Sequence, residues 1–197
     1  MMSYILSAEY NTFNMISYLH DISIDYSLFS EGISLKALCG KLVFKVKNES
    51  GFNKLKKCHI ISTTGPDLVS NELKEILNNV APDEVEFFNA EIFYGNKKIE
   101  GFSVINPIVR VDCCNMEKSE YKITNFDPKN PTYMFSYTVL LEAIPYNLNV
   151  VRCNERHGLI VVSERIKQEC INAKLKGLQF CKSIDMTYND RSDCEKI

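Results

Sequence analysis

Two segments of this chain repeat one pattern, and this repeat is the feature that most constrains the fold. Residues 69–88 read VSNELKEILNNVAPDEVEFF, and residues 162–181 read VSERIKQECINAKLKGLQFC. Each begins with a serine suited to cap a helix, continues with a glutamate in the first turn, and repeats apolar residues at helical spacing. The pattern predicts amphipathic helices at about 70–80 and 163–174, each followed by a strand.

Strict alternation of apolar and polar residues predicts strands elsewhere, because successive side chains of a strand point to opposite faces of a sheet. KLVFKVK places Leu42, Phe44 and Val46 on one side, and DISIDYS, residues 21–27, repeats the alternation. Further strands are expected at 3–8, 59–63, 85–88, 102–111, 137–143, 148–153, 159–162 and 178–184, with a hairpin turning at Gly95-Asn96. The expected fold class is α+β, with mostly antiparallel or mixed sheet and two principal helices.

The domain organisation follows from these elements. We expect a single α+β domain over residues 1–184, and the repeat suggests two weakly related halves, 1–89 and 90–184. FDPKNP, residues 126–131, is predicted to be a mobile connection because it holds two prolines. The polar residues 185–197 are predicted to be a frayed tail.

Composition and charge exclude several classes of protein. A formal net charge of -2 argues against general nucleic-acid binding, which requires a basic surface. No apolar run approaches the roughly 20 residues that span a bilayer, so no membrane partner is expected. The first residues, MMSYILSAEY, lack the basic region and apolar core of a secretory signal. The expected location is therefore the cytoplasm.

The eight cysteines could be disulfides, metal ligands, a nucleophile or parts of the core. Without an export signal, and with enough residues to bury a core, the chain is expected to keep them as free core residues. No C-x2-4-C or H-x3-5-H pair is present, so no metal and no cofactor are expected. In VDCCNMEKSEY, residues 111–121, adjacent Cys113 and Cys114 are expected to face opposite sides of a strand. No histidine lies near them in sequence, so no catalytic residue is predicted.

Two motifs carry a resemblance to a known family. NPIVRVDCCNMEKSEY resembles the middle signature of immunity family eleven of the bacterial polymorphic toxin systems, and NVVRCNERHGLIVVSERIKQECINAKLKGLQF resembles the C-terminal end of that family. The similarity covers about residues 90–181. The signature positions, expected to be structural, are Asp112, Cys113, Glu117, Ser119, Tyr121, Ser163 and Gly177.

The resemblance implies an immunity protein that is not an enzyme. Such a protein binds the C-terminal domain of a cognate toxin as a monomer, in a tight 1:1 complex that covers the toxin active site. One alternative is a hydrolase that reverses the modification made by the toxin, using Cys113, Cys114 or Asp112. Another is a general scaffold or adaptor domain.

Two groups of residues are candidates for toxin contact. Glu72 and Glu75 belong to an acidic group around the first predicted helix that could face a basic toxin groove, although a solvated helix face gives the same pattern. The members of this group are Asp67, Glu72, Glu75, Asp83, Glu84 and Glu86. Tyr133, Phe135 and Tyr137 alternate on a predicted strand. They are core residues if that face is buried and interface anchors if it is exposed.

Overall fold

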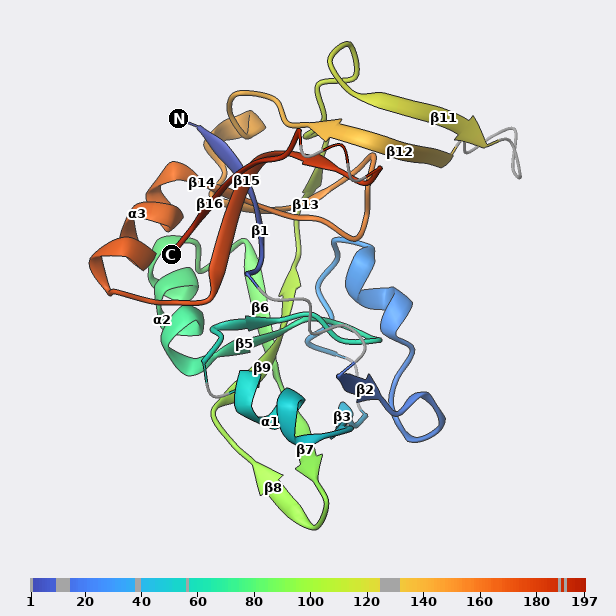
Figure 1. The fold of residues 1–197 in the computed structure, drawn as a ribbon, viewed down its shortest axis with the longest axis vertical. Helices are drawn as coiled ribbons and strands as arrows, with labels where there is room; N and C mark the ends of the chain where they lie inside the picture. Colours follow the sequence, from blue (N-terminus) through green and yellow to red (C-terminus); the bar gives the residue numbers. More distant parts are fainter. Residues whose placement is uncertain are drawn as a thin grey trace.

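The strands of the computed structural model form three sheets within the residues that it describes, 2–9, 15–37, 40–55, 57–124, 132–187, 189 and 191–197 (Figure 1). Antiparallel pairs predominate, and helices pack against the sheets, so the fold class is α+β as predicted. The predicted mobile connection, 126–131, lies outside the described residues. No helix of the described chain is long and apolar enough to cross a membrane.

The largest sheet contains the strands from both ends of the chain. Its order is β10 (Arg110–Val111), β13 (Val150–Cys153), β14 (Ile160–Ser163), β1 (Ser3–Ala8), β15 (Leu178–Asp185), β12 (Thr132–Val139) and β11 (Glu120–Thr124). β10 and β13 are parallel, and the other neighbours are antiparallel. The predicted pairing of residues 148–153 with residues 159–162 is confirmed as the β13–β14 pair.

Two smaller sheets complete the β structure. One has the order β2 (Ile16–Tyr18), β3 (Val43–Val46), β7 (Glu91–Tyr94) and β8 (Lys97–Ile99), and the other has the order β4 (Ile60–Ile61), β5 (Leu68–Ser70), β9 (Phe102–Pro107) and β6 (Val85–Asn89). The helices are α1 (Glu49–Leu55), α2 (Asn71–Val80) and α3 (Glu164–Asn172), with 3-10 turns η1 (His20–Ile22), η2 (Tyr26–Ser30) and η3 (Pro145–Asn147). The hairpin at Gly95-Asn96 forms as predicted, between β7 and β8.

The sequence repeat corresponds to two strand–helix–strand units of the same kind. β5 and β6 flank β9, with α2 between them in sequence, and β14 and β15 flank β1, with α3 between them. Leu73 on α2 and Ile166 on α3 occupy equivalent positions and are fully buried. Both lie in one hydrophobic cluster, where the two helices pack together. The division of the chain into related halves stays a prediction.

The two helices begin differently despite their shared serine. The hydroxyl of Ser70 accepts a hydrogen bond from the Leu73 amide at 3.3 Å, which is the predicted N-cap. Ser163 stands at the equivalent position, but its hydroxyl donates to the side-chain carbonyl of Asn149 at 2.9 Å and accepts no bond from the helix. The prediction that Ser163 caps α3 is therefore wrong, because Asn149 competes for its hydroxyl.

The structure corrects the predicted strand at residues 21–27. Residues 21–22 and 26–27 belong to the 3-10 turns η1 and η2, residues 23–25 connect them, and Ile22 and Tyr26 are 60% and 47% exposed. The Asp25 carboxylate accepts a hydrogen bond from the Ser27 amide and starts the second turn. The local hydrogen bond of Asp25 therefore decides the structure of this segment, because the alternating residues do not pair with a neighbouring strand.

The frayed tail and the free cysteines are corrected as well. Residues 193–196 form β16, which pairs with β15 and places Cys194 opposite Cys181. These two cysteines are joined by a disulfide. The tail orders because β16 pairs with residues 179–183 of β15, while β12 pairs with residues 183–185, and backbone pairing does not require apolar side chains.

Candidate functional site

The strands β11 and β12 form the outer end of the largest sheet and extend beyond its other strands (Figure 1). We call residues 120–124 and 132–139 the β11–β12 arm. Its register pairs Tyr121 with Phe135 and Ile123 with Tyr133 on one face, and Lys122 with Met134 on the other. Sheet pairing thus fixes which side chains each face of the arm presents.

One face of the arm anchors it to the body of the protein. The Tyr121 ring lies 5.3 Å from the Tyr133 ring and 5.5 Å from the Phe135 ring, measured between centroids. Phe135 is 8% exposed and belongs to a hydrophobic cluster that includes Cys113 and Cys114. Of the three alternating aromatics predicted from the sequence, Phe135 is therefore a core residue, while Tyr133 and Tyr137 are half-buried.

Apolar side chains remain exposed around the arm. Ile123 is 57% exposed and Met134 is 62% exposed. Met186, which follows β15, is 51% exposed, and its amide donates to the Ser136 carbonyl of the arm at 2.8 Å. Ile123 and Met134 lie on opposite faces of the arm, so a protein partner that covers both must enclose the arm from two sides.

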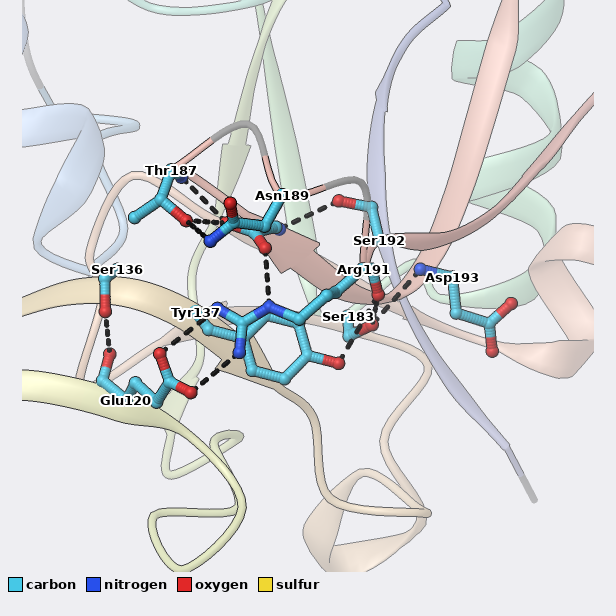
Figure 2. Close-up of polar contacts among 10 residues, drawn as sticks. Glu120, Ser136, Tyr137, Ser183, Thr187, Asn189, Arg191, Ser192 and Asp193 are labelled. Carbon is cyan, nitrogen blue, oxygen red and sulfur yellow. Dashed lines mark hydrogen bonds and ion pairs between the residues drawn. The ribbon is translucent and has the colours of Figure 1, made fainter.

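Arg191 joins three strands at the base of the arm (Figure 2). Its guanidinium donates to both carboxylate oxygens of Glu120 on β11, at 2.7 and 3.1 Å, and to Asp185 on β15 at 2.7 Å. It also lies over the Tyr137 ring of β12, 4.3 Å from the centroid. The Thr187 hydroxyl and Arg191 lower the pKa of Asp185 to about 2, and Arg191 lowers the pKa of Glu120.

This arginine was missed by the sequence reasoning. It lies in the segment predicted to be frayed, far in sequence from Glu120, and a charged residue in a polar tail gives no local signal of its partners. Bidentate binding and ring stacking are the interactions at which arginine excels. The geometry fixes β11 relative to β15, so the arm is held at its base as well as along its ladder.

Only part of the acidic group around α2 is exposed in the structure, because some of its carboxylates bind backbone amides of the protein itself. Glu84 accepts the amides of Asn149 and Val150, both at 2.7 Å, and Glu86 is 4% exposed and accepts the Leu35 amide at 2.8 Å. Burial raises the pKa of Asp67, also counted in this group, to about 6.

The exposed members of that group are Glu72, Glu75 and Asp83. Glu72 lies on the rim of a cavity of about 410 Å³ beside His59, 3.8 Å from its Nδ1 atom. Burial lowers the pKa of His59, so at neutral pH this side chain does not cancel the charge of Glu72. The two glutamates proposed for toxin contact are therefore accessible.

The cysteine pair contradicts the expectation of one buried and one outward side chain. Cys113 and Cys114 are both buried, at 3% and 4% exposure. Here the backbone has left β10, and the carboxylate of Glu155 accepts the amides of Cys113 and Cys114 at 2.9 and 3.0 Å. Because Cys113 and Cys114 lie beyond the end of the strand, their side chains do not alternate between the two faces of the sheet, and both can be buried.

The surroundings of the cysteines do not favour a nucleophile. Hydrogen bonding to Cys153 and burial raise the pKa of both Cys113 and Cys114, which disfavours the reactive thiolate. Cys153 is fully buried, and the thiols of Cys113 and Cys114 lower its pKa. The sulfur atoms of Cys114 and Cys153 and a carboxylate oxygen of Glu155 lie within 4.8 Å of one another, so this group could hold a metal ion.

The other signature residues have identifiable positions. The Asp112 carboxylate accepts from the Asn154 amide group at 2.6 Å, and Glu117 is exposed. The Ser119 hydroxyl accepts the Val139 amide at 2.9 Å. Gly177 has φ +73°, and a side chain there would meet the Lys57 carbonyl oxygen at 2.9 Å.

Comparison with known proteins places this chain among the immunity proteins. A family model described as Immunity protein family (Imm11) matches residues 40–185, which is most of the chain. The chain belongs to this family. The match includes the β11–β12 arm and the cysteine group, and it extends well before residue 90, where the resemblance was recognised. No curated protein matches the chain.

Proposed function

We propose that this protein neutralises a cognate toxin by binding the toxin's C-terminal domain as a monomer in a tight 1:1 complex, without chemistry of its own. Family membership implies a toxin partner, and the observation that carries the mode of action is the exposed apolar surface on the β11–β12 arm. Inhibition by binding requires a few well-placed anchors and complementary charge, not a catalytic group.

The anchors in this proposal are Ile123, Met134 and Tyr137. Ile123 and Met134 are more than half exposed, so a partner can remove large apolar areas from water. Tyr137 is held under Arg191, so its position costs little further ordering on binding. Phe135 supports the arm from the core, and Tyr133 packs on Tyr121 at its side.

The complex forms in the cytoplasm and covers the toxin active site. This part of the proposal rests on family membership. Active sites are usually concave, and an arm that extends from the body of the protein can enter such a cleft.

The proposal is tested with the C-terminal domain of the cognate toxin. The wild-type protein is expected to form a 1:1 complex in size-exclusion chromatography with light scattering. The double variant Ile123→Glu, Met134→Glu should bind at least about 30-fold more weakly, because removing an anchor costs about 2 kcal/mol or more. Ile22→Glu is the matched control, because Ile22 is 60% exposed on a different part of the protein. Equal binding by the arm variant and the control would reject the arm as the interface.

The same system tests the alternative enzyme. Cys113→Ser, Cys114→Ser and Asp112→Asn are assayed for toxin binding and for protection of cells. The proposal expects binding and protection to fall together or to persist together in each folded variant. A variant that binds the toxin normally and fails to protect would support the hydrolase.

A further inference from the structure

The carboxyl ends of two parallel strands bring together side chains that are distant in sequence. β10 and β13 pair in parallel, with Val111 opposite Cys153. Cys114 follows β10 and Glu155 follows β13, so the ends of both strands supply ligand-type groups to one place. C-x-x-C spacing cannot reveal such a group, because its members come from separate segments.

We propose that Cys114, Cys153 and Glu155 form a binding site for a divalent transition-metal ion of the zinc type. The Sγ atoms of Cys114 and Cys153 are 3.6 Å apart, and Sγ of Cys153 is 3.3 Å from Oε2 of Glu155. Two thiolates that bind one tetrahedral zinc ion lie about 3.8 Å apart, and a thiolate and a carboxylate oxygen about 3.5 Å apart, given zinc–sulfur bonds of about 2.3 Å. Two of the three donor pairs therefore already have the spacing for one ion, and all three donor atoms lie within 4.8 Å of one another.

The surroundings orient these donors. The amides of Cys113 and Cys114 donate to Oε2 and Oε1 of Glu155, which fixes the plane of the carboxylate and leaves lone pairs on both oxygens. The Cys113 thiol donates to the Val111 carbonyl at 3.3 Å, and its sulfur is not part of the group of three donor atoms that lie within 4.8 Å of one another. A solvent molecule would take the fourth position.

The charges also fit a divalent ion. Two thiolates and one carboxylate carry three negative charges, which are costly in the hydrophobic cluster that contains both cysteines. Arg156, the residue after Glu155, donates to the Thr138 hydroxyl at 2.9 Å, and burial lowers its pKa while Cys114 and Cys153 oppose that shift. One divalent ion and this guanidinium neutralise the three ligands.

Glu155 is the most exposed of the three donors. Cys114 and Cys153 are buried at 4% and 0% exposure, while Glu155 is half-buried. An ion can therefore reach the thiols past the carboxylate. The site lies in the same hydrophobic cluster as Phe135, so a bound ion would stabilise the layer on which the β11–β12 arm rests.

The test uses the full chain, reduced with a phosphine and stripped of metal. Titration with cobalt(II) is expected to give one equivalent bound, with thiolate-to-cobalt charge-transfer absorption and the visible bands of a tetrahedral ion, both abolished by zinc. Zinc should raise the melting temperature, and a chelator should reverse this. Wild-type protein that shows free thiols by titration and no such absorption overturns the proposal, whatever the variants do.

Variants then assign the ligands. Cys114→Ser, Cys153→Ser and Glu155→Gln should each weaken cobalt binding by more than about 100-fold, beyond the loss typical for residues that only support a ligand. Cys170→Ser is the matched control, because Cys170 is a fully buried free cysteine in a different hydrophobic cluster. Circular dichroism confirms folding of each variant. Equal loss in Cys170→Ser would assign the absorption to other thiols and reject the site.

Discussion

The guanidinium of Arg191 lies 4.3 Å from the centroid of the Tyr137 ring and at the same time pairs with both carboxylate oxygens of Glu120. Tyr137 and Glu120 are opposite each other in the β11–β12 ladder, beside a register shift in the arm. One side chain from the end of the chain thus stabilises the place where the ladder is irregular. This arrangement makes the C-terminal segment part of the candidate binding surface.

Replacing Arg191 with alanine should loosen this region and leave the core unchanged. The amides of Asp185 and Asp193 donate to the hydroxyls of Ser192 and Ser183. In the variant these amides should exchange with solvent roughly tenfold faster, because local opening then requires no breaking of the Arg191 ion pairs. Native-state hydrogen exchange measures this. Arg165→Ala, at an exposed position on α3, is the control and should leave these amides unaffected. Unchanged exchange in Arg191→Ala would show that the network does not hold the base of the arm.

Much of the fold could be predicted from the sequence, because local patterns encode it. Helices α2 and α3 follow from apolar residues at helical spacing, with the capping serine Ser70 at the start of α2, and the β13–β14 pair follows from two aliphatic strands around a short turn. The prediction failed at residues 21–27, where alternation had no partner strand. It failed again for the tail, because the pairing of β16 depends on an edge of β15 that no local pattern describes.

The candidate site was less predictable than the fold. The alternating aromatics pointed to β12, but which of them is buried depends on the packing of Phe135 against distant cysteines. The grouping of Cys114 with Cys153 depends on the parallel β10–β13 pair. Interactions of this kind join residues far apart in the chain, so a single sequence does not contain a local signal for them.

Gly177 should tolerate alanine much less well than Gly95. Both have positive φ, +73° and +58°, but a Cβ atom at Gly177 would lie 2.9 Å from the Lys57 carbonyl oxygen, while nothing lies within 4 Å at Gly95. Gly95→Ala should lower the free energy of unfolding by about 1 to 2 kcal/mol from backbone strain alone. Gly177→Ala adds a clash with backbone and should cost about 2 to 5 kcal/mol. Urea denaturation of the two variants compares them, and equal costs would contradict the close packing at Gly177.

The pKa of Asp67 predicts a pH dependence of stability. Burial raises this pKa from 3.8 to about 6, and nearby Arg152 opposes the rise. The folded protein therefore binds more protons at Asp67 than the unfolded chain between about pH 4 and pH 6, so this group makes the free energy of unfolding fall as pH rises through that window. The contribution is at most about 3 kcal/mol.

Asp67→Asn should remove that contribution. Unfolding curves at several pH values are compared, and the difference between wild type and variant is the quantity of interest, because other groups titrate in both proteins. Glu155, whose pKa burial raises to about 7, acts in the same direction, and Asp185, with a pKa lowered to about 2, acts in the opposite one. A difference that stays constant from pH 4 to pH 7 would show that Asp67 titrates normally in the folded protein.

Salt should separate the two candidate contact surfaces. Glu72 and Glu75 are exposed on α2, so if they steer a basic toxin groove, the association rate should fall steeply as salt rises, because exposed charges are screened within about 10 Å at 0.1 M. The double variant Glu72→Lys, Glu75→Lys should then associate about tenfold more slowly at low salt and dissociate at the normal rate.

The arm variant Ile123→Glu, Met134→Glu should instead dissociate faster, because lost apolar contact acts mainly on the bound state. Surface plasmon resonance at several salt concentrations distinguishes the two effects. An association rate that changes neither with salt nor with the lysine substitutions would show that the acidic surface does not steer binding, and the arm would then be the surface to map.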